Sequence, residues 1–133
     1  MDVQAVNRRV IEQFRAGDPV EGMHRDRLVL LTTTGRRTGT PYTTPMMFHP
    51  DGDRILVVAS NVGAPTHPDW YLNLLADPAV TVELDTESYP ATATPLRDAD
   101  YQRSWAEIVR LYPFFADHAR KTDCTVPVVA LRR

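Results

Sequence analysis

The sequence has very few of the residues that stabilise a fold covalently or through metal. Cys124 is the one cysteine, which excludes a disulfide framework and a zinc cluster of several cysteines. A single thiol also favours a reducing, cytoplasmic setting. The histidines are scattered without the spacing of metal ligands, and we therefore predict no metal site at His24, His49, His67 or His118.

Excess positive charge and long apolar runs are also missing. The formal net charge is -2 and the isoelectric point is near 6.0, which argues against a nucleic-acid-binding module. No stretch is long and apolar enough to cross a bilayer, and residues 1–10 lack the apolar centre of a signal peptide. We therefore expect no nucleic-acid partner and no integral membrane segment. Lys121 is the only lysine, so nearly every cation is an arginine, which suits forked binding of anions.

The sequence signatures of several enzyme classes are absent. Arg36 and Arg37 stand where a phosphate-binding loop would need Gly-Lys-Ser, and no trio of spaced glycines follows a strand as in a dinucleotide site. No G-x-S-x-G turn indicates a serine hydrolase. By elimination, we expect any catalysis to belong to a bound cofactor that the protein positions.

Residues 28–48 form the most informative segment. Leu28 to Thr34 is an apolar, β-branched run that predicts a buried strand, and β-forming residues return from Tyr42 to Met47. The intervening Gly35-Arg36-Arg37-Thr38-Gly39 predicts a tight turn. Two guanidinium groups at such a tip can hold a phosphate or a carboxylate. The alternative is a solvated hairpin that carries arginines, because turns are commonly polar.

The remaining pattern predicts one α+β domain over residues 1–133. Helical spacing predicts an N-terminal helix over 3–15, joined by a polar connector that ends at residue 27. Its expected role is to cover the core, with contact to a membrane surface or a partner as the alternative. Further helices are expected at 69–75 and 98–111, a turn at 49–53, and strands at 54–60, 80–84, 89–96 and 125–131. We expect Leu75 and Leu111 to lie on the inward faces of these helices, and Asp98 or Asp100 to cap the second helix. Six mostly antiparallel strands joined by turns favour a barrel over an open sheet.

Two other places suit a flat, anionic cofactor. Residues 59–65 end a strand in small residues, which would let a ring or phosphate approach backbone N–H groups. The helix that begins near Trp70 would point the positive end of its dipole at the same loop. Core packing is the alternative role for Trp70.

Four runs of the chain carry a family likeness: LLTTTGRRTGTPYTTPMMF, LVVAS, GAPTHPDWYLNLLADPAVTVEL and LYPFFADHARKTDCTVPVVAL. In order and spacing they resemble the deazaflavin-dependent nitroreductase family of the split-barrel flavin-binding superfamily, over roughly residues 28–131. The resemblance implies a six-stranded, mostly antiparallel split β-barrel with flanking helices. It also implies coenzyme F420, a 5-deazaflavin with a phosphate and glutamates in its tail, as the cofactor. The expected reaction is hydride transfer from reduced F420 to a small conjugated acceptor such as a quinone, enone or nitro compound.

The same resemblance implies roles for individual residues. The hairpin turn would hold the tail, the second strand would lie along the ring, the loop near residue 60 would touch the ring edge or phosphate, and the helix after it would stand behind. The implied cofactor-binding residues are Thr32, Arg36, Arg37, Thr38, Gly39, Thr40, Pro41, Met46, Met47, Val58, Ala59, Ser60, Asn61, Trp70 and Asn73. The implied substrate-binding residues are Tyr112, Phe115 and His118. Tyr112 and Ser60 are the expected catalytic residues, because a hydroxyl can donate to an acceptor oxygen.

Two alternatives remain open at this point. Tyr42, Asn61 and Thr66 stand where relatives often have basic residues, and a cofactor with a single phosphate, FMN, would need fewer cations. A protein that stores or shields F420, a flavin or a tetrapyrrole without turnover would need the same pocket. The expected assembly is a monomer or a homodimer. The expected location is the cytoplasm, with peripheral membrane association as the alternative.

Overall fold

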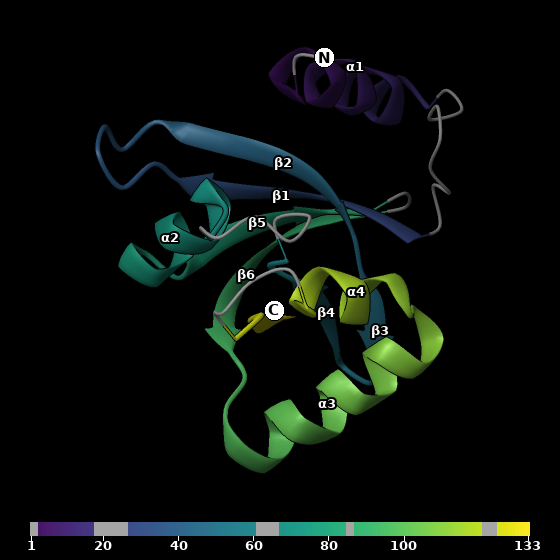
Figure 1. Ribbon diagram of the computed structural model, residues 1–133. Coiled ribbons are helices and arrows are strands. Elements are labelled where there is room, and N and C mark those ends of the chain that lie inside the picture. Colours follow the sequence, from purple (N-terminus) through teal and green to yellow (C-terminus); the bar gives the residue numbers. More distant parts are fainter. Residues whose placement is uncertain (1–2, 18–26, 61–66, 85–86, 121–124) are drawn as a thin grey trace.

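A computed structural model describes residues 3–17, 27–60, 67–84, 87–120 and 125–133, with side chains from residue 8 onward. Within these ranges the helices are α1 (Val3–Ala16), α2 (Asp69–Ala76), α3 (Asp98–Leu111) and α4 (Phe114–Arg120). The strands are β1 (Leu28–Thr34), β2 (Pro41–Met47), β3 (His49–Asp51), β4 (Arg54–Val58), β5 (Ala79–Glu83), β6 (Ser88–Pro95) and β7 (Val128–Arg132). They form one antiparallel sheet in the order β2-β1-β5-β6-β7-β4-β3 (Figure 1).

The two border strands of this sheet are consecutive in the chain. β2 ends at Met47 and pairs with β1, whereas β3 begins at His49 and pairs with β4, so Phe48 alone separates the two borders. The backbone N–H of Phe48 donates to the carbonyl of Arg27 at 3.1 Å. A single bent strand therefore contributes to both borders and curls the sheet into a split barrel. The α+β barrel is confirmed, but the predicted strand count was low, because residues 49–51 were expected in a turn and instead form β3.

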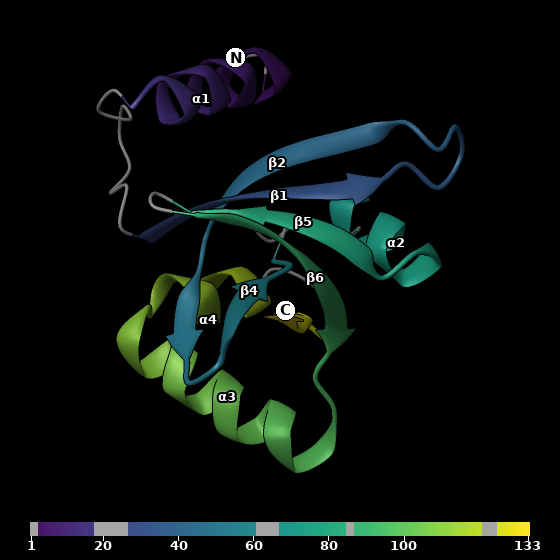
Figure 2. The same cartoon turned by 180° about the vertical axis from the view of Figure 1, so that it is seen from behind.

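Strand alternation divides the apolar residues between the interior and two outer layers. Val29 and Leu31 face the barrel core, whereas Leu28 and Leu30 pack on the other side against Val10 and Phe14 of α1. On β4, Leu56 packs with Ile108 of α3, while Ile55 and Val57 face inward. Figure 2 shows α1 on one side of the barrel, with α3 and α4 together on the other.

The helix predictions succeed in position and fail at individual side chains. α1 is followed directly by Gly17, whose φ of +80° suits a residue without a Cβ. Leu75 and Leu111 were expected to face inward but are 53% and 44% exposed. Each is at or next to the last residue of its helix.

The start of α3 is held by an ion-pair network in place of the expected aspartate cap. The guanidinium of Arg54 donates two hydrogen bonds to Asp100, at 2.8 and 3.0 Å, and one to Asp51 at 2.7 Å. No side chain caps the helix at Arg97. The hydrogen bonds from Arg54 lower the pKa of Asp100 to about 2, against partial desolvation. This network ties α3 to the border strand β4.

Candidate functional site

The turn between β1 and β2 is built on glycine. The N–H of Gly35 donates to the carbonyl of Thr40, and the N–H of Gly39 donates to the carbonyl of Gly35, each at 2.8 Å. A Cβ on Gly35 would lie 3.0 Å from the Thr40 carbonyl oxygen, a contact so tight that the backbone at Thr40 would have to shift. Gly39 has a φ of +74°, in the left-handed region. These contacts fix the direction in which the intervening arginines leave the backbone.

Arg36 is held against α2 by two residues. Its guanidinium donates to Asn73 Oδ1 at 2.8 Å and pairs with Asp69 Oδ1 at 3.2 Å. Its backbone N–H also donates to Asn73 Oδ1, at 3.2 Å. Asn73 is 4% exposed, and its side-chain amide donates a hydrogen bond to the hydroxyl of Thr33 at 3.3 Å. Of the two guanidinium groups at the tip of the turn, that of Arg36 is therefore already paired with residues of α2.

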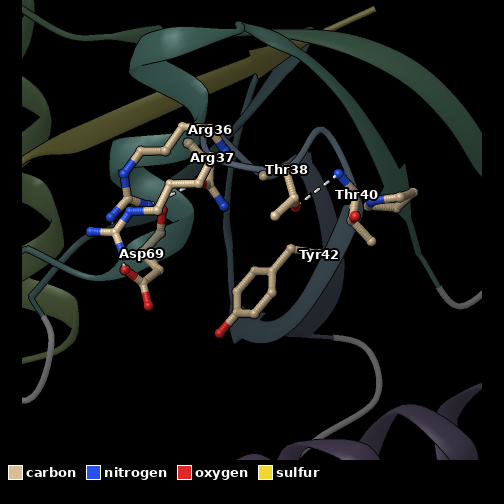
Figure 3. A pocket seen from close by; sticks show the side chains of 9 residues that line it. Arg36, Arg37, Thr38, Thr40, Tyr42 and Asp69 are labelled. Carbon is tan, nitrogen blue, oxygen red and sulfur yellow. Dashed lines mark hydrogen bonds and ion pairs between the residues drawn. The ribbon is translucent and has the colours of Figure 1, made fainter.

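A cavity of about 240 Å³ opens beside this turn. Figure 3 shows the arginine side chains above Asp69, with the ring of Tyr42 nearby. In the part of the chain that the structure describes, the side chain of Arg37 forms no hydrogen bond or ion pair. The cavity is lined by Gly35, Arg36, Arg37, Thr38, Thr40, Pro41, Tyr42, Asp69 and Asn73.

The electrostatics of this cavity favour an anion. Arg36 and Arg37 contribute two positive charges and Asp69 one negative charge, which leaves an excess of one positive charge. Asp69 is 67% exposed, so its ion pair is worth about 0–1 kcal/mol and an incoming phosphate can compete for Arg36. The first turn of α2 lies at the same cavity and adds its positive dipole end. The donors present fit the phosphate and carboxylates of a deazaflavin tail.

A second group of site residues gathers where α4 meets the end of β4. His118 Nδ1 lies 3.1 Å from the hydroxyl oxygen of Ser60, which is 9% exposed. The ring of Phe115 lies edge-on to His118 and Tyr112, with centroid separations of 6.0 and 6.3 Å. The ring of Phe114 lies 4.3 Å from that of Phe115, tilted by 43°, and is 40% exposed. The structure thus places the Ser60 hydroxyl at His118, and ring contacts through Phe115 connect His118 to Tyr112.

Sequence reasoning missed two residues of this second group. The hydroxyl of Tyr112 lies 3.4 Å from His49 Nδ1, and His49 Nε2 lies 3.6 Å from a carboxylate oxygen of Glu107. His49 was placed in a turn, and Glu107 was an unremarked polar position on a helix. No local pattern links positions 49, 107 and 112, because a cross-strand pairing and a helix packing bring them together.

Other predicted cofactor residues are spread over both faces of the sheet. Met46 packs on the barrel core, whereas Met47 lies on the outer face beside Tyr112 and Phe115, as strand alternation requires. Thr32 lies outside the arginine cavity and pairs its hydroxyl with Thr43 at 2.8 Å. Trp70 is 7% exposed within the core cluster, which supports its alternative packing role.

The strand end after β4 needs a separate description. Val58 lies on the outer face of the barrel wall with the α3 layer, and Ala59 donates its N–H to the carbonyl of Pro127 at 3.0 Å. Ser60 follows directly and remains buried. Asn61, predicted to touch the cofactor, lies outside the described residues, as does Thr66.

A larger cavity, of about 390 Å³, lies elsewhere, around the start of α3. Arg54, Arg97 and Arg132 line it together with Asp100. The charge of Arg54 is balanced by Asp51 and Asp100, so this arrangement serves to attach α3. Among the described residues no cluster of three histidine, cysteine, aspartate or glutamate side chains could hold a metal ion. No helix in those ranges has the length and apolar character to span a membrane.

Comparison with known proteins places this geometry in a family. The family model described as F420H2-dependent quinone reductase matches residues 5–133. An F420H2-dependent quinone reductase of Mycobacterium tuberculosis is 38% identical over 109 residues, covering 79% of this chain and 72% of the relative.

Two solved structures are also similar. A structure of an F420-H2 dependent reductase (FDR-A) has a TM-score of 0.72 and 35% identity, and covers 84% of this chain and 100% of that one. A second structure, described as a domain-swapped dimer, has a TM-score of 0.74 and 32% identity, covering 94% of this chain and 96% of that one. The chain therefore belongs to the F420H2-dependent quinone reductase family, a family of oxidoreductases whose cofactor is coenzyme F420.

Proposed function

We propose that this protein holds the anionic tail of F420 in the cavity at the β1–β2 turn. The observation that carries the proposal is the pair of arginines on that cavity, with Arg36 fixed by Asn73 and Arg37 unpaired among the described residues. A fixed guanidinium loses little freedom when it binds an oxyanion, and an unpaired one supplies net charge. Thr38 and Thr40 add hydroxyl and backbone donors on the same wall.

The reacting end of the site is the group around Ser60 and α4. When bound, the reduced deazaflavin supplies a hydride. The rings of Phe114 and Phe115, which are tilted to each other, offer an apolar aromatic surface for an acceptor such as a quinone. The hydroxyls of Tyr112 and Ser60 are the groups that donate to the acceptor oxygen as negative charge develops there. His118 holds Ser60 in place for this role.

Binding and turnover are tested separately. F420 fluorescence is titrated with the wild-type protein and with the double variant that carries both Arg36→Ala and Arg37→Ala. Each lost charge-assisted contact costs about 1.5–3 kcal/mol, so affinity should fall at least about tenfold for each arginine. Arg103→Ala, a change at a 75% exposed arginine of α3, is the matched control and should bind normally. Unchanged binding by the double variant would refute the tail site.

Turnover distinguishes an enzyme from a carrier. Reduced F420 is mixed with menadione and protein, and the return of oxidised F420 absorbance is followed. A carrier would bind F420 and leave this absorbance unchanged. FMN is titrated in parallel, because a cavity with one excess positive charge also suits a single phosphate.

The assembly state also belongs to the proposal. Val10 and Phe14 of α1 cover β1 of the same chain, so we propose a monomer. We also propose that the protein works in the cytoplasm, the reducing setting that its single cysteine favours. The similar structure described as a domain-swapped dimer makes exchange of an element between two copies the competing arrangement. Size-exclusion chromatography with light scattering separates the two.

A further inference from the structure

The imidazole of His49 has a titratable partner at each of its two nitrogens. Nδ1 lies 3.4 Å from the hydroxyl of Tyr112, and Nε2 lies 3.6 Å from the carboxylate of Glu107. The side chain of His49 is 13% exposed, whereas that of Glu107 is 43% exposed. Glu107, His49 and Tyr112 therefore form a connected series of proton-carrying groups, from the more exposed carboxylate through the imidazole to the phenol.

The bent strand places the imidazole there. His49 opposes Leu56 in the β3–β4 pairing, and Leu56 packs on Ile108 of α3, so the His49 side chain faces α3 as well. Glu107 lies one helical position before Ile108, and Tyr112 follows the end of the same helix. The Tyr112 ring lies edge-on to the imidazole, with a centroid separation of 5.9 Å. The backbone N–H of Tyr112 donates to the carbonyl of Ile108 at 2.7 Å. Strand and helix thus hold both rings.

We propose that His49 and Glu107 form a proton relay that supplies Tyr112 during reduction of the acceptor. This inference rests on the proposed function, in which Tyr112 donates to the acceptor oxygen. His49 and Glu107 are positioning and proton-carrying residues that do not touch the acceptor. A carboxylate next to an imidazole fixes the ring orientation, and the two ring nitrogens allow an imidazole to pass a proton between two partners.

The proton balance is simple. With protons on both nitrogens, Nε2–H points to Glu107 and Nδ1–H donates to the Tyr112 oxygen, which leaves the phenolic hydrogen for the acceptor. The acceptor gains the hydride with its two electrons, the phenolic O–H bond breaks, and a new O–H bond forms on the acceptor. The Nδ1 proton then restores the phenol. Water returns one proton to the imidazole between turnovers.

Few groups compete for this imidazole. Of the described titratable residues, Glu107 and Tyr112, both from the α3 side, are those in contact with it. On β4, the strand paired with β3, the residue opposite is the apolar Leu56. Among the described titratable residues, the imidazole can therefore exchange protons with these two side chains.

The first test compares His49→Asn with Tyr112→Phe in quinone turnover. Asparagine keeps a polar atom near the position of Nδ1 but cannot carry a proton or reach Glu107. We expect kcat to fall about tenfold or more, with KM nearly unchanged. Adding His49→Asn to Tyr112→Phe should cost little further, because both remove one function. His67→Asn, at a histidine that contacts Tyr71, is the matched control and should leave turnover unchanged.

The second test needs no cofactor. Nitrogen-15 NMR of the ring shows which imidazole nitrogens carry protons, and the Nδ1 signal should shift in Tyr112→Phe while the Nε2 signal shifts in Glu107→Gln. Signals unaffected by these substitutions would overturn the contacts. An active wild type with an equally active His49→Asn would overturn the relay. An inactive wild type would instead refute the proposed function, while the NMR result still decides the contacts.

Discussion

His118 Nδ1 lies 3.1 Å from Ser60 Oγ and links α4 to the chain after β4. The pair is 58 positions apart in sequence. Ser60 is buried and His118 is partly buried, so this hydrogen bond is shielded from much of the solvent and orients the serine hydroxyl. It is the contact that joins a predicted catalytic residue to a predicted substrate-binding residue.

Substituting this pair should affect turnover non-additively. His118→Phe removes the partner of Ser60, and we expect kcat with menadione to fall about three- to tenfold, the value of one neutral hydrogen bond. Ser60→Ala should cause a similar loss, and the double variant should lose little more than either single variant. Steady-state kinetics at a fixed F420 concentration measure the three variants. Losses that simply multiply would show that the two side chains act independently.

Removing the negative charge at the arginine cavity should strengthen anion binding. Asp69→Asn frees Arg36 from its ion pair, and we expect the Kd for F420 to fall about two- to fivefold at low salt, as for an exposed pair. The gain should shrink in 0.5 M salt because of screening. Asp117→Asn on α4 changes the net charge equally and serves as the control. Equal gains from both variants would indicate a general charge effect and contradict a local one.

Asn73 should matter for both stability and binding. Asn73→Ala leaves the backbone N–H of Arg36 without its partner and removes the hydrogen bond that the Thr33 hydroxyl accepts, which should cost about 1–3 kcal/mol of unfolding free energy. F420 affinity should also fall, because Arg36 loses its fixed orientation. Urea unfolding and fluorescence titration measure the two effects. Leu75→Ala, an exposed position on the same helix, should change neither. A stable Asn73→Ala variant with normal affinity would contradict this role.

Stability should depend on Asp100 in acid. The pKa of its carboxyl is lowered from 3.8 to about 2 by the hydrogen bonds from Arg54. Because the unfolded chain takes up this proton at higher pH than the folded chain, the stabilisation is complete above about pH 5 and is lost as pH falls toward 2. Asp100→Asn should therefore be less stable than wild type at pH 7, with the gap closing in acid. Urea midpoints at several pH values measure it, and a constant gap would contradict the assignment.

Local patterns were sufficient for the hairpin and most of the elements. Gly35 and Gly39 punctuate the turn, alternating residues identify the strands, and Gly17 ends the first helix. These features depend on neighbours in sequence, which is why they could be predicted. The α+β barrel followed from the number and spacing of short strands.

Long-range placement was the part that could not be predicted. Whether Arg36 is free depends on Asn73 and Asp69 of α2, more than thirty positions away. The contacts of His49 depend on a bend of the strand at Phe48, which is not a residue typical of turns. The residues that follow, His-Pro-Asp-Gly, have the composition of a loop although the first three form β3. Sequence therefore identified most of the chemical groups but could not state which of them already have partners.

The bend at Phe48 also limits how the barrel can change size. One residue connects β2 and β3, the two border strands of the sheet. These strands therefore cannot move apart to widen the barrel unless strand pairing is broken. A bulkier quinone must then be accommodated by the helical layer of α3 and α4, leaving the circumference of the barrel unchanged. Evolution or engineering toward larger acceptors should therefore alter the α3–α4 corner first.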